Sequence, residues 1–462
     1  MSAAASAAAT VERRPWGEAL LWLAGLTPFF FLSYSFANWV TGLRHHVPEV
    51  AFAWERHIPF LAWTIVPYWT TDFFYAGSLL LCRTRAELRT QGRRLAAVQV
   101  FCVAGFLLFP LQFRFPRPHA GGLFGQMFDA LMSFDRPFNQ APSLHVALTA
   151  VLWAAYSRHL RGPLLWLVRG WFVLMALSTL TTYQHHFLDI PTGLWAGLFV
   201  VMLFPSRRRG DVGERPRDPR RFRLAAAYGV GAAILFGSAW LDGGLAWLML
   251  WPAAAMAVVA GVYVSGRADL FGKSESGELT PAALGVLAPY VAAAWLSSRW
   301  HTRREAPAHE IAGGVWLGRI PRRAEREAMG FRSVVDLTAE LPFDSTGIAY
   351  RSVPLLDMLR PTEGQLDAAV AAIQSFGSAR PTLVNCALGY SRSAAAVAAW
   401  LVATGRARSS AEAVEFIRAR RPSIVLPASG VGRTPSSAAG PEPQTEGGGG
   451  GPAENLRGAR TN

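Results

Sequence analysis

The sequence predicts an α-helical multi-span membrane domain, with about eight spans plus one re-entrant or interfacial segment, followed by a soluble α/β domain. Hydrophobic residues make up 51% of the 462 residues, and they gather in long blocks before residue 300. A block of ~20 apolar residues is long enough to cross a bilayer as a helix. After residue 305, short β-like runs alternate with helix-like stretches, which is typical of a parallel or mixed sheet.

The expected spans are apolar stretches with few charges. They occupy residues 17–40, 58–81, 95–112, 143–157, 163–183, 187–205, 224–241 and 244–264. The next stretch, 280–298, contains Pro281 and Pro289. Because proline removes a hydrogen bond from a helix interior, we expect this stretch to be broken and re-entrant or interfacial rather than spanning.

Arginine-rich connectors predict the orientation. Arginines gather before the first span and in residues 82–94, 158–162 and 206–223. All four places lie on one face if every span crosses, and Arg-rich short loops stay cytoplasmic. We therefore expect a multi-pass protein of the cytoplasmic membrane whose C-terminal domain is cytoplasmic. The net charge of +14 then reflects topology, and no nucleic-acid partner is expected.

Five regions follow from these patterns. They are residues 1–57 with the first span, a membrane domain at 58–205, a basic loop with additional membrane helices at 206–304, an α/β domain at 305–427 and a disordered tail at 428–462. The tail is rich in Gly, Pro and Ser, a composition that cannot bury enough apolar surface to fold. The three cysteines, Cys82, Cys102 and Cys386, give no disulfide framework.

The segment around Cys386 has the composition of an anion-binding loop. A β-like run, 382–386, delivers the cysteine to a tight loop that enters an Ala-rich helix. Backbone N–H groups at a helix N-terminus attract anions and lower the pKa of a thiol. Arg392 can contact two oxygens of a phosphate, and Ser393 can hydrogen-bond the sulfur as it leaves. The candidate phosphate-binding residues of the loop are Ala387, Leu388, Gly389, Tyr390 and Ser391.

A candidate acid lies upstream. Asp357 follows a β-like run, on a loop bounded by Pro354 and Pro361. A mobile carboxylic acid in this position can protonate a leaving oxygen and then activate water.

These residues resemble the dual-specificity phosphatase family of the protein tyrosine phosphatase superfamily. Cys386, five residues, then Arg392 and Ser393 match the family signature, and the 335–340 run and the position of Asp357 are also similar. The resemblance covers about 120 residues. It implies a phosphocysteine intermediate, with no metal and no cofactor. The family usually has His before the cysteine, whereas this sequence has Asn385.

A second group of polar residues is expected at span ends on the face opposite the Arg-rich loops. His145 opens the fourth span after Ser143, and Arg117 follows the third span. His185 and Asp189 are four residues apart, so they share one face of a helix. A carboxylate can fix the tautomer of an imidazole and raise its nucleophilicity, and ionisable residues that converge within a membrane indicate a functional site.

Residues 58–205 resemble the type 2 phosphatidic acid phosphatase superfamily. The resemblance implies a phosphohistidine on His185, oriented by Asp189, with His145 as acid and with Arg117 and Ser143 holding the phosphate. Two cations of the family pattern are replaced, by Pro110 and Thr179. In this respect the sequence looks more like the inositol phosphorylceramide synthase and sphingomyelin synthase branch, whose members transfer a head group.

The leading hypothesis is a bifunctional membrane phosphatase that acts on lipid phosphates at one site and on phosphate monoesters at the cytoplasmic site. The alternatives are a head-group transferase in the membrane half, and a Ser/Thr/Tyr protein phosphatase or a non-catalytic phosphate sensor in the soluble half. The neutral loop 387–391 favours a monophosphate substrate, either a lipid such as phosphatidylglycerophosphate or a phosphoprotein side chain. The expected partners are that substrate and membrane lipids. The sequence does not indicate an oligomeric state.

Overall fold

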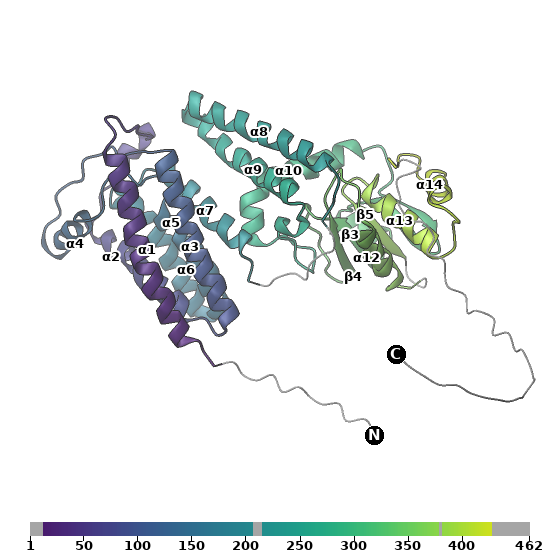
Figure 1. Ribbon diagram of the computed structural model, residues 1–462, viewed down its shortest axis with the longest axis horizontal. Coiled ribbons are helices and arrows are strands. Elements are labelled where there is room, and N and C mark those ends of the chain that lie inside the picture. The colour runs from purple at the N-terminus through teal and green to yellow at the C-terminus, as the bar shows by residue number, and fades with distance from the viewer. Residues whose placement is uncertain (1–12, 207–214, 378–380, 427–462) are drawn as a thin grey trace, which may run out of the picture.

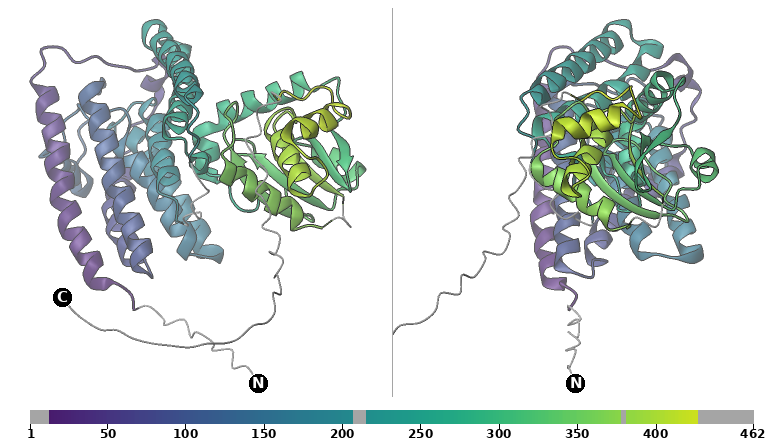
Figure 2. Two further views of the ribbon diagram at one scale, coloured as in Figure 1. Left: turned by 45° about the vertical axis from the view of Figure 1, so that its right-hand side comes forward. Right: turned by 90° about the vertical axis from the view of Figure 1, so that its right-hand side faces the viewer.

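The computed structural model describes residues 13–206, 215–377 and 381–426; the expected tail at 428–462 lies outside these residues. Helices α1 to α7 form one bundle, and α8 to α10 lie between this bundle and the α/β domain (Figures 1 and 2). The helices are α1 Trp16–Gly42, α2 Ile65–Leu80, α3 Arg85–Leu108, α4 Gly122–Met132, α5 Leu144–His159, α6 Gly162–Thr181, α7 Asp189–Leu203, α8 Arg220–Asp242, α9 Leu250–Ser265 and α10 Pro281–His301.

Within the described residues, five helical segments are long and apolar enough to cross a membrane: α1, α6, α8, Gly244–Ser265 and α10. The segment Gly244–Ser265 joins the 3-10 turn η3 (Gly244–Met249) to α9. This finding suggests membrane association, but it does not confirm the expected eight spans. Helices α2 and α5 have 16 residues and α7 has 15, which is below the ~20 that a straight crossing needs.

The expected break at 280–298 is wrong, because α10 is one continuous helix of 21 residues that passes through Pro289. Pro281 occupies its first turn, where the missing N–H costs nothing, and the side chain of Thr280 caps it by accepting from Ala283 N. A single internal proline is tolerated when neighbouring helices support the kinked turn, and α10 packs against α7 and α9.

The C-terminal domain is a five-stranded mixed sheet in the order β1-β2-β5-β3-β4. Its strands are β1 Ala308–Ala312, β2 Val315–Arg319, β3 Ser333–Thr338, β4 Ala349–Leu355 and β5 Thr382–Cys386; its helices are α11 Arg323–Ala328, α12 Glu363–Gln374, α13 Arg392–Ala403 and α14 Ser410–Arg418. The sequence predicts all of these except β1, through β-like runs at 314–317, 333–337, 350–353 and 382–386 and helix-like stretches at 321–329, 363–377, 391–404 and 409–420. That edge strand pairs antiparallel with β2 through Gly313 and Gly314, whose positive φ angles of 54° and 77° suit a tight hairpin.

The central strand β5 is buried along its whole length, and its two faces belong to different cores. Val384 packs in a core with Val397 of α13. On the other face, Leu383 belongs to a core that also contains Val259 of α9 and Val286 of α10. Helices α9 and α10, which follow the α1–α7 bundle, therefore share one hydrophobic core with the sheet.

A buried ion pair also links the loop between α9 and α10 to the sheet. Lys273 lies in the loop between α9 and α10, and its Nζ is 2.5 Å from Asp336 Oδ2 in β3. Lys273 also donates to the carbonyl and hydroxyl oxygens of Thr338, and Tyr350 OH donates to Asp336. Both charged side chains are completely buried. Because removing one partner of such a pair leaves the other charge unpaired and out of water, the pair strongly couples the loop to the sheet.

We predict that Lys273→Met will lower the free energy of unfolding by about 3–5 kcal/mol, the usual cost of breaking a buried pair. The measurement is the thermal unfolding midpoint of the full-length protein in detergent. Arg267→Met is the matched control, since the Arg267–Asp269 pair is partly exposed and such pairs contribute about 0–1 kcal/mol. Equal midpoints for the two variants would contradict the proposed coupling.

Candidate functional site

The loop after β5 arranges donors around the sulfur of Cys386. Gly389 N donates to Cys386 Sγ at 3.2 Å, and Ser393 Oγ lies 3.3 Å from the same sulfur. Gly389 has φ 76°, and a Cβ atom there would lie 2.6 Å from the carbonyl carbon of Gly318. Only glycine fits this approach, so the loop can bend tightly enough to direct its amide groups at the thiol.

Four carbonyl groups of this loop accept hydrogen bonds from residues outside the loop. Ile320 N donates to Cys386 O, Ser298 Oγ to Ala387 O, Arg421 Nε to Gly389 O and Val425 N to Tyr390 O, over 2.5–3.1 Å. A peptide whose carbonyl is bonded outward directs its N–H inward. The loop is thereby organised as a cradle of N–H groups, which binds anions.

Arg392, the first residue of α13, is 1% exposed and is held by carboxylates. Its two Nη atoms bind the two carboxylate oxygens of Glu340 at 2.9 and 2.7 Å, and Nη2 lies 3.1 Å from Asp357 Oδ1. Burial by itself lowers the pKa of Arg392, but Asp357, Glu340 and Cys386 outweigh it and raise the pKa well above its usual value. The guanidinium therefore stays charged in the site. Its Nε has no hydrogen-bond partner in the described part of the chain.

The acid loop follows β4 and places Asp357 over this guanidinium. The Asp357 side chain is 38% exposed, so it can meet both solvent and a ligand. The next residue, Met358, has φ 58°, a strained value for a non-glycine residue. Tyr263 OH of α9 donates to Asp357 O at 3.3 Å, and this bond fastens the strained turn to a helix that precedes the domain.

Asn385 occupies the place before the cysteine. Its Nδ2 donates to Asp336 Oδ1 at 3.0 Å, and it is fully buried. Asp336 is also the partner of Lys273. The amide therefore joins the base of the cysteine loop to the buried ion pair between the sheet and the loop before α10.

The comparison with protein families decides what this arrangement is. The model described as "Dual specificity phosphatase, catalytic domain" matches residues 315–431. The C-terminal region is a dual-specificity phosphatase domain. The protein is accordingly a phosphoric monoester hydrolase of the dual-specificity type. A comparison with curated proteins found no match.

Three solved structures are similar to the phosphatase domain. Human DUSP28 is 23% identical over 27% of this chain and 88% of that chain, with a TM-score of 0.24. Tk-PTP in the active form is 28% identical over 26% and 88%, with a TM-score of 0.24. PTPMT1 in complex with PI(5)P is 23% identical over 27% and 90%, with a TM-score of 0.25.

Sequence reasoning missed four residues that support the phosphatase site. Glu340 grips Arg392, Arg421 and Ser298 hold loop carbonyls, and Tyr263 holds the acid loop. Glu340 was recognised only as part of a family-like run. The other three lie 32 to 94 residues from their partners, and no local pattern marks a contact across that distance.

The second group of candidate residues is brought together between α5 and α7. His185 Nδ1 lies 3.1 Å from Asp189 Oδ2, and both residues are buried. Ser143 caps α5, and its backbone N–H donates to Asp189 O at 3.1 Å. The carbonyl of Thr179 accepts a hydrogen bond from His185 N.

His145, expected as the acid, and Arg117, expected to hold the phosphate, both form hydrogen bonds within the protein. His145 Nε2 lies 2.6 Å from Thr71 Oγ1 and 2.8 Å from Tyr68 O, so this nitrogen is directed at α2. Arg117 donates to the carbonyls of Thr182 and Tyr183. In this conformation Arg117 supports the backbone that precedes His185, and its guanidinium is engaged by that backbone.

We predict that Glu340→Gln will lower kcat/KM for an aryl phosphate about 10- to 100-fold. Loss of a charge-assisted contact costs about 1.5–3 kcal/mol, and Arg392 would lose its bidentate alignment. The measurement is steady-state kinetics of the full-length protein, with Glu363→Gln, exposed in the first turn of α12, as the control. A Glu340→Gln variant as active as the control would show that Glu340 does not position Arg392.

Proposed function

We propose that the phosphatase domain removes the phosphate monoester of a membrane lipid at the cytoplasmic face of the membrane. The observation that carries the proposal is the attachment of the site to apolar helices. Ser298 of α10 bonds the cysteine loop, and Tyr263 of α9 bonds the acid loop. With these helices in or on the bilayer, the site lies at the level of lipid head groups, where a lipid phosphate reaches it without leaving the membrane.

The geometry supports the following catalytic roles. The Cys386 thiolate attacks phosphorus, the S–P bond forms and the P–O bond of the ester breaks, while Asp357 gives its proton to the departing alcohol. Arg392 and the loop N–H groups stabilise the equatorial oxygens. Water deprotonated by Asp357 then attacks the thiophosphate and releases phosphate, and Ser393 donates a hydrogen bond to the leaving sulfur.

Substrate class is inferred from the charge of the loop. The side chains of Ala387, Leu388, Gly389, Tyr390 and Ser391 are neutral, and a loop that grips several phosphates needs additional cations. A lipid carrying a single monoester phosphate fits this loop best. A phosphoprotein side chain is the second candidate, because the loop chemistry is the same for both.

The cytoplasmic placement is supported by the attachment of α10. The loop before this helix inserts Lys273 into the phosphatase domain, and the end of the helix contacts the domain through Ser298 and Arg299. Both ends of α10 are thus tied to one folded domain, which favours a helix lying along the membrane surface. The Arg-rich connectors and the reduced thiol that the mechanism needs agree with a cytoplasmic domain.

For the membrane half we propose a lipid-phosphate phosphatase that works through a phosphohistidine on His185. The 3.1 Å contact with Asp189 supports this role, because the carboxylate orients the imidazole for attack. The absence of Arg at 179 and Lys at 110 favours the second candidate, a head-group transferase. A phosphodiester has a single negative charge and needs fewer cations than a monoester dianion.

We predict that Cys386→Ser will abolish hydrolysis of lipid phosphate monoesters by the phosphatase domain and that Asp357→Asn will slow it by about 10²–10⁴-fold, the range for general acid catalysis. The full-length protein in lipid nanodiscs is required, since Lys273 and Ser298 belong to the folded unit. The variant His185→Ala isolates the phosphatase domain, and a soluble phosphopeptide is compared with a lipid phosphate. Higher kcat/KM for the phosphopeptide, or loss of activity with a chelator, would contradict the proposal.

The membrane site is tested in the Cys386→Ser background. We predict that labelled lipid phosphate will release free phosphate and that His185→Ala and Asp189→Asn will remove this activity. A new lipid formed from labelled phospholipid would instead establish the transferase. No product from either substrate would show that the membrane half is not catalytic.

A further inference from the structure

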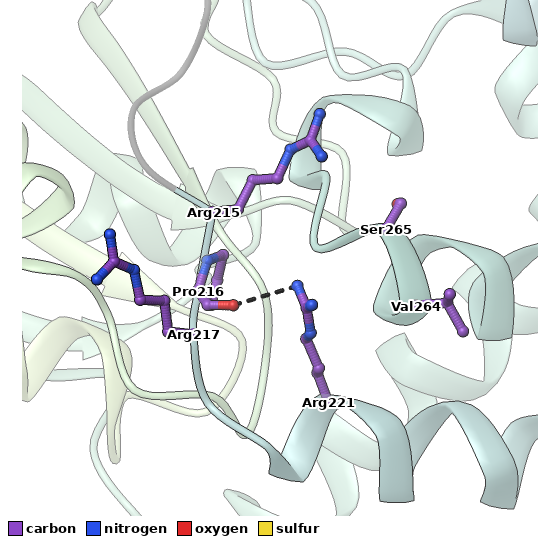
Figure 3. Close-up of a pocket in the computed structure, with 6 residues that line it drawn as sticks. All are labelled: Arg215, Pro216, Arg217, Arg221, Val264 and Ser265. Carbon is purple, nitrogen blue, oxygen red and sulfur yellow. Dashed lines mark hydrogen bonds between the residues drawn. The ribbon is translucent and has the colours of Figure 1, made fainter.

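A basic pocket lies where the chain enters α8 and leaves α9 (Figure 3). Its volume is about 440 Å³, and its lining residues are Arg215, Pro216, Arg217, Arg221, Val264 and Ser265. The pocket is separate from the cysteine loop, and neither the phosphatase mechanism nor the membrane site uses its residues.

The pocket is built to hold an anion. Figure 3 shows the guanidinium groups of Arg215 and Arg221 approaching the space beside Ser265, with Arg217 on the far side of the same segment. Arg221 Nη1 donates to Pro216 O at 3.3 Å. No carboxylate of the described residues forms an ion pair with any of the three arginines.

A glycine keeps room for the guanidinium groups. Gly266 has φ 67°, and a Cβ atom at this position would lie 2.9 Å from Arg221 Nη1 and 3.6 Å from Arg215 Cβ. A larger residue would push into the space between the two arginines. The left-handed backbone at this position, which favours glycine, ends α9 beside both side chains.

The position of the pocket indicates the source of the anion. Helix α8 and the segment Gly244–Ser265 are two of the five candidate spans, and the pocket lies at the end that they share. This inference rests on the proposed function, which places α9 in or on the bilayer, and with α8 beside it the shared end lies among lipid head groups. Arginine is suited to phosphate because its planar donors bind two oxygens at once.

We propose that this pocket binds the phosphodiester head group of an anionic phospholipid and that its occupancy activates the phosphatase site. Each wall of the pocket reaches the acid loop by one hydrogen bond. Asp218 Oδ2, in the wall that holds Arg217 and Arg221, accepts from Arg360 N at 3.3 Å. Tyr263 OH, adjacent to Val264 in the other wall, donates to Asp357 O.

The coupling acts through these two bonds. A phosphodiester drawn between Arg215 and Arg221 brings the segment before α8 toward the end of α9. The acid loop is bonded to both, so its strained turn at Met358 is held in the geometry that places Asp357 over Arg392. A ligand shifts an equilibrium by the difference between its affinities for the two states, and here the favoured state has the acid in place.

The test measures hydrolysis of a water-soluble aryl phosphate by full-length His185→Ala protein, in nanodiscs of phosphatidylcholine alone or with phosphatidylglycerol. We expect the rate to be at least about fivefold higher with phosphatidylglycerol. This factor is the lower end of the usual range of coupling between two binding sites. Arg215→Gln and Arg221→Gln, made singly, bring the ratio of the two rates close to one. The ratio is independent of how much of each variant folds.

The control is Arg223→Gln, which removes the same charge from the exposed face of α8 outside the pocket and keeps the wild-type ratio. Equal rates in both bilayers, or a ratio that falls equally in the control, would overturn the pocket assignment. Water-soluble glycerophosphoglycerol added to neutral nanodiscs tests a free diester, and the same activation by it would overturn the lipid assignment. Hydrolysis of a lipid phosphate in neutral nanodiscs is measured in parallel. Its loss would count against the proposed function, whereas loss of activation alone would count only against the pocket.

Discussion

The outward bonding of the cysteine-loop carbonyls is the constraint on which the phosphatase site depends. A loop of neutral residues attracts phosphate only if its N–H groups converge, and they converge because Ala387 O and Gly389 O are bonded from outside by Ser298 and Arg421. Ser298 belongs to α10, which precedes the phosphatase domain. Ser298, which helps to shape the cysteine loop, therefore lies in region 206–304, outside the boundaries that the sequence predicts for the α/β domain.

The charged groups of the site are also paired with residues from distant segments of the chain. Arg392 is buried with Glu340, and Asp336 is buried with Lys273 from the loop before α10. Burying such charges is costly unless each finds a partner with good geometry. The pairs consequently fix the relative position of the elements that carry them, and they make the junction between the helices and the sheet a rigid part of the enzyme.

Backbone strain marks both candidate sites. Among the described residues, the non-glycine positions with positive φ are Tyr183, two residues before His185, and Met358, directly after Asp357. Such conformations cost about 1–3 kcal/mol and persist where the surroundings hold them. Arg117 bonds Tyr183 O, and Tyr263 bonds the loop of Met358. In each candidate site a polar side chain from another segment forms a hydrogen bond that holds the strained turn.

The sequence by itself determined the elements and chemistry that are local. Strand β5 is the predicted run at 382–386, and the spacing of Cys386, Arg392 and Ser393 placed a thiol, a guanidinium and a hydroxyl around one helix start. Contacts between distant segments were decided only by the tertiary structure, because burial selects partners such as Glu340, Ser298 and Lys273 without leaving a local pattern. The expected count of eight spans is not confirmed for a related reason. Helices α7 and α2 have 15 and 16 residues, whereas a straight crossing needs ~20, and hydropathy alone does not distinguish an apolar helix packed inside a bundle from one that crosses a bilayer.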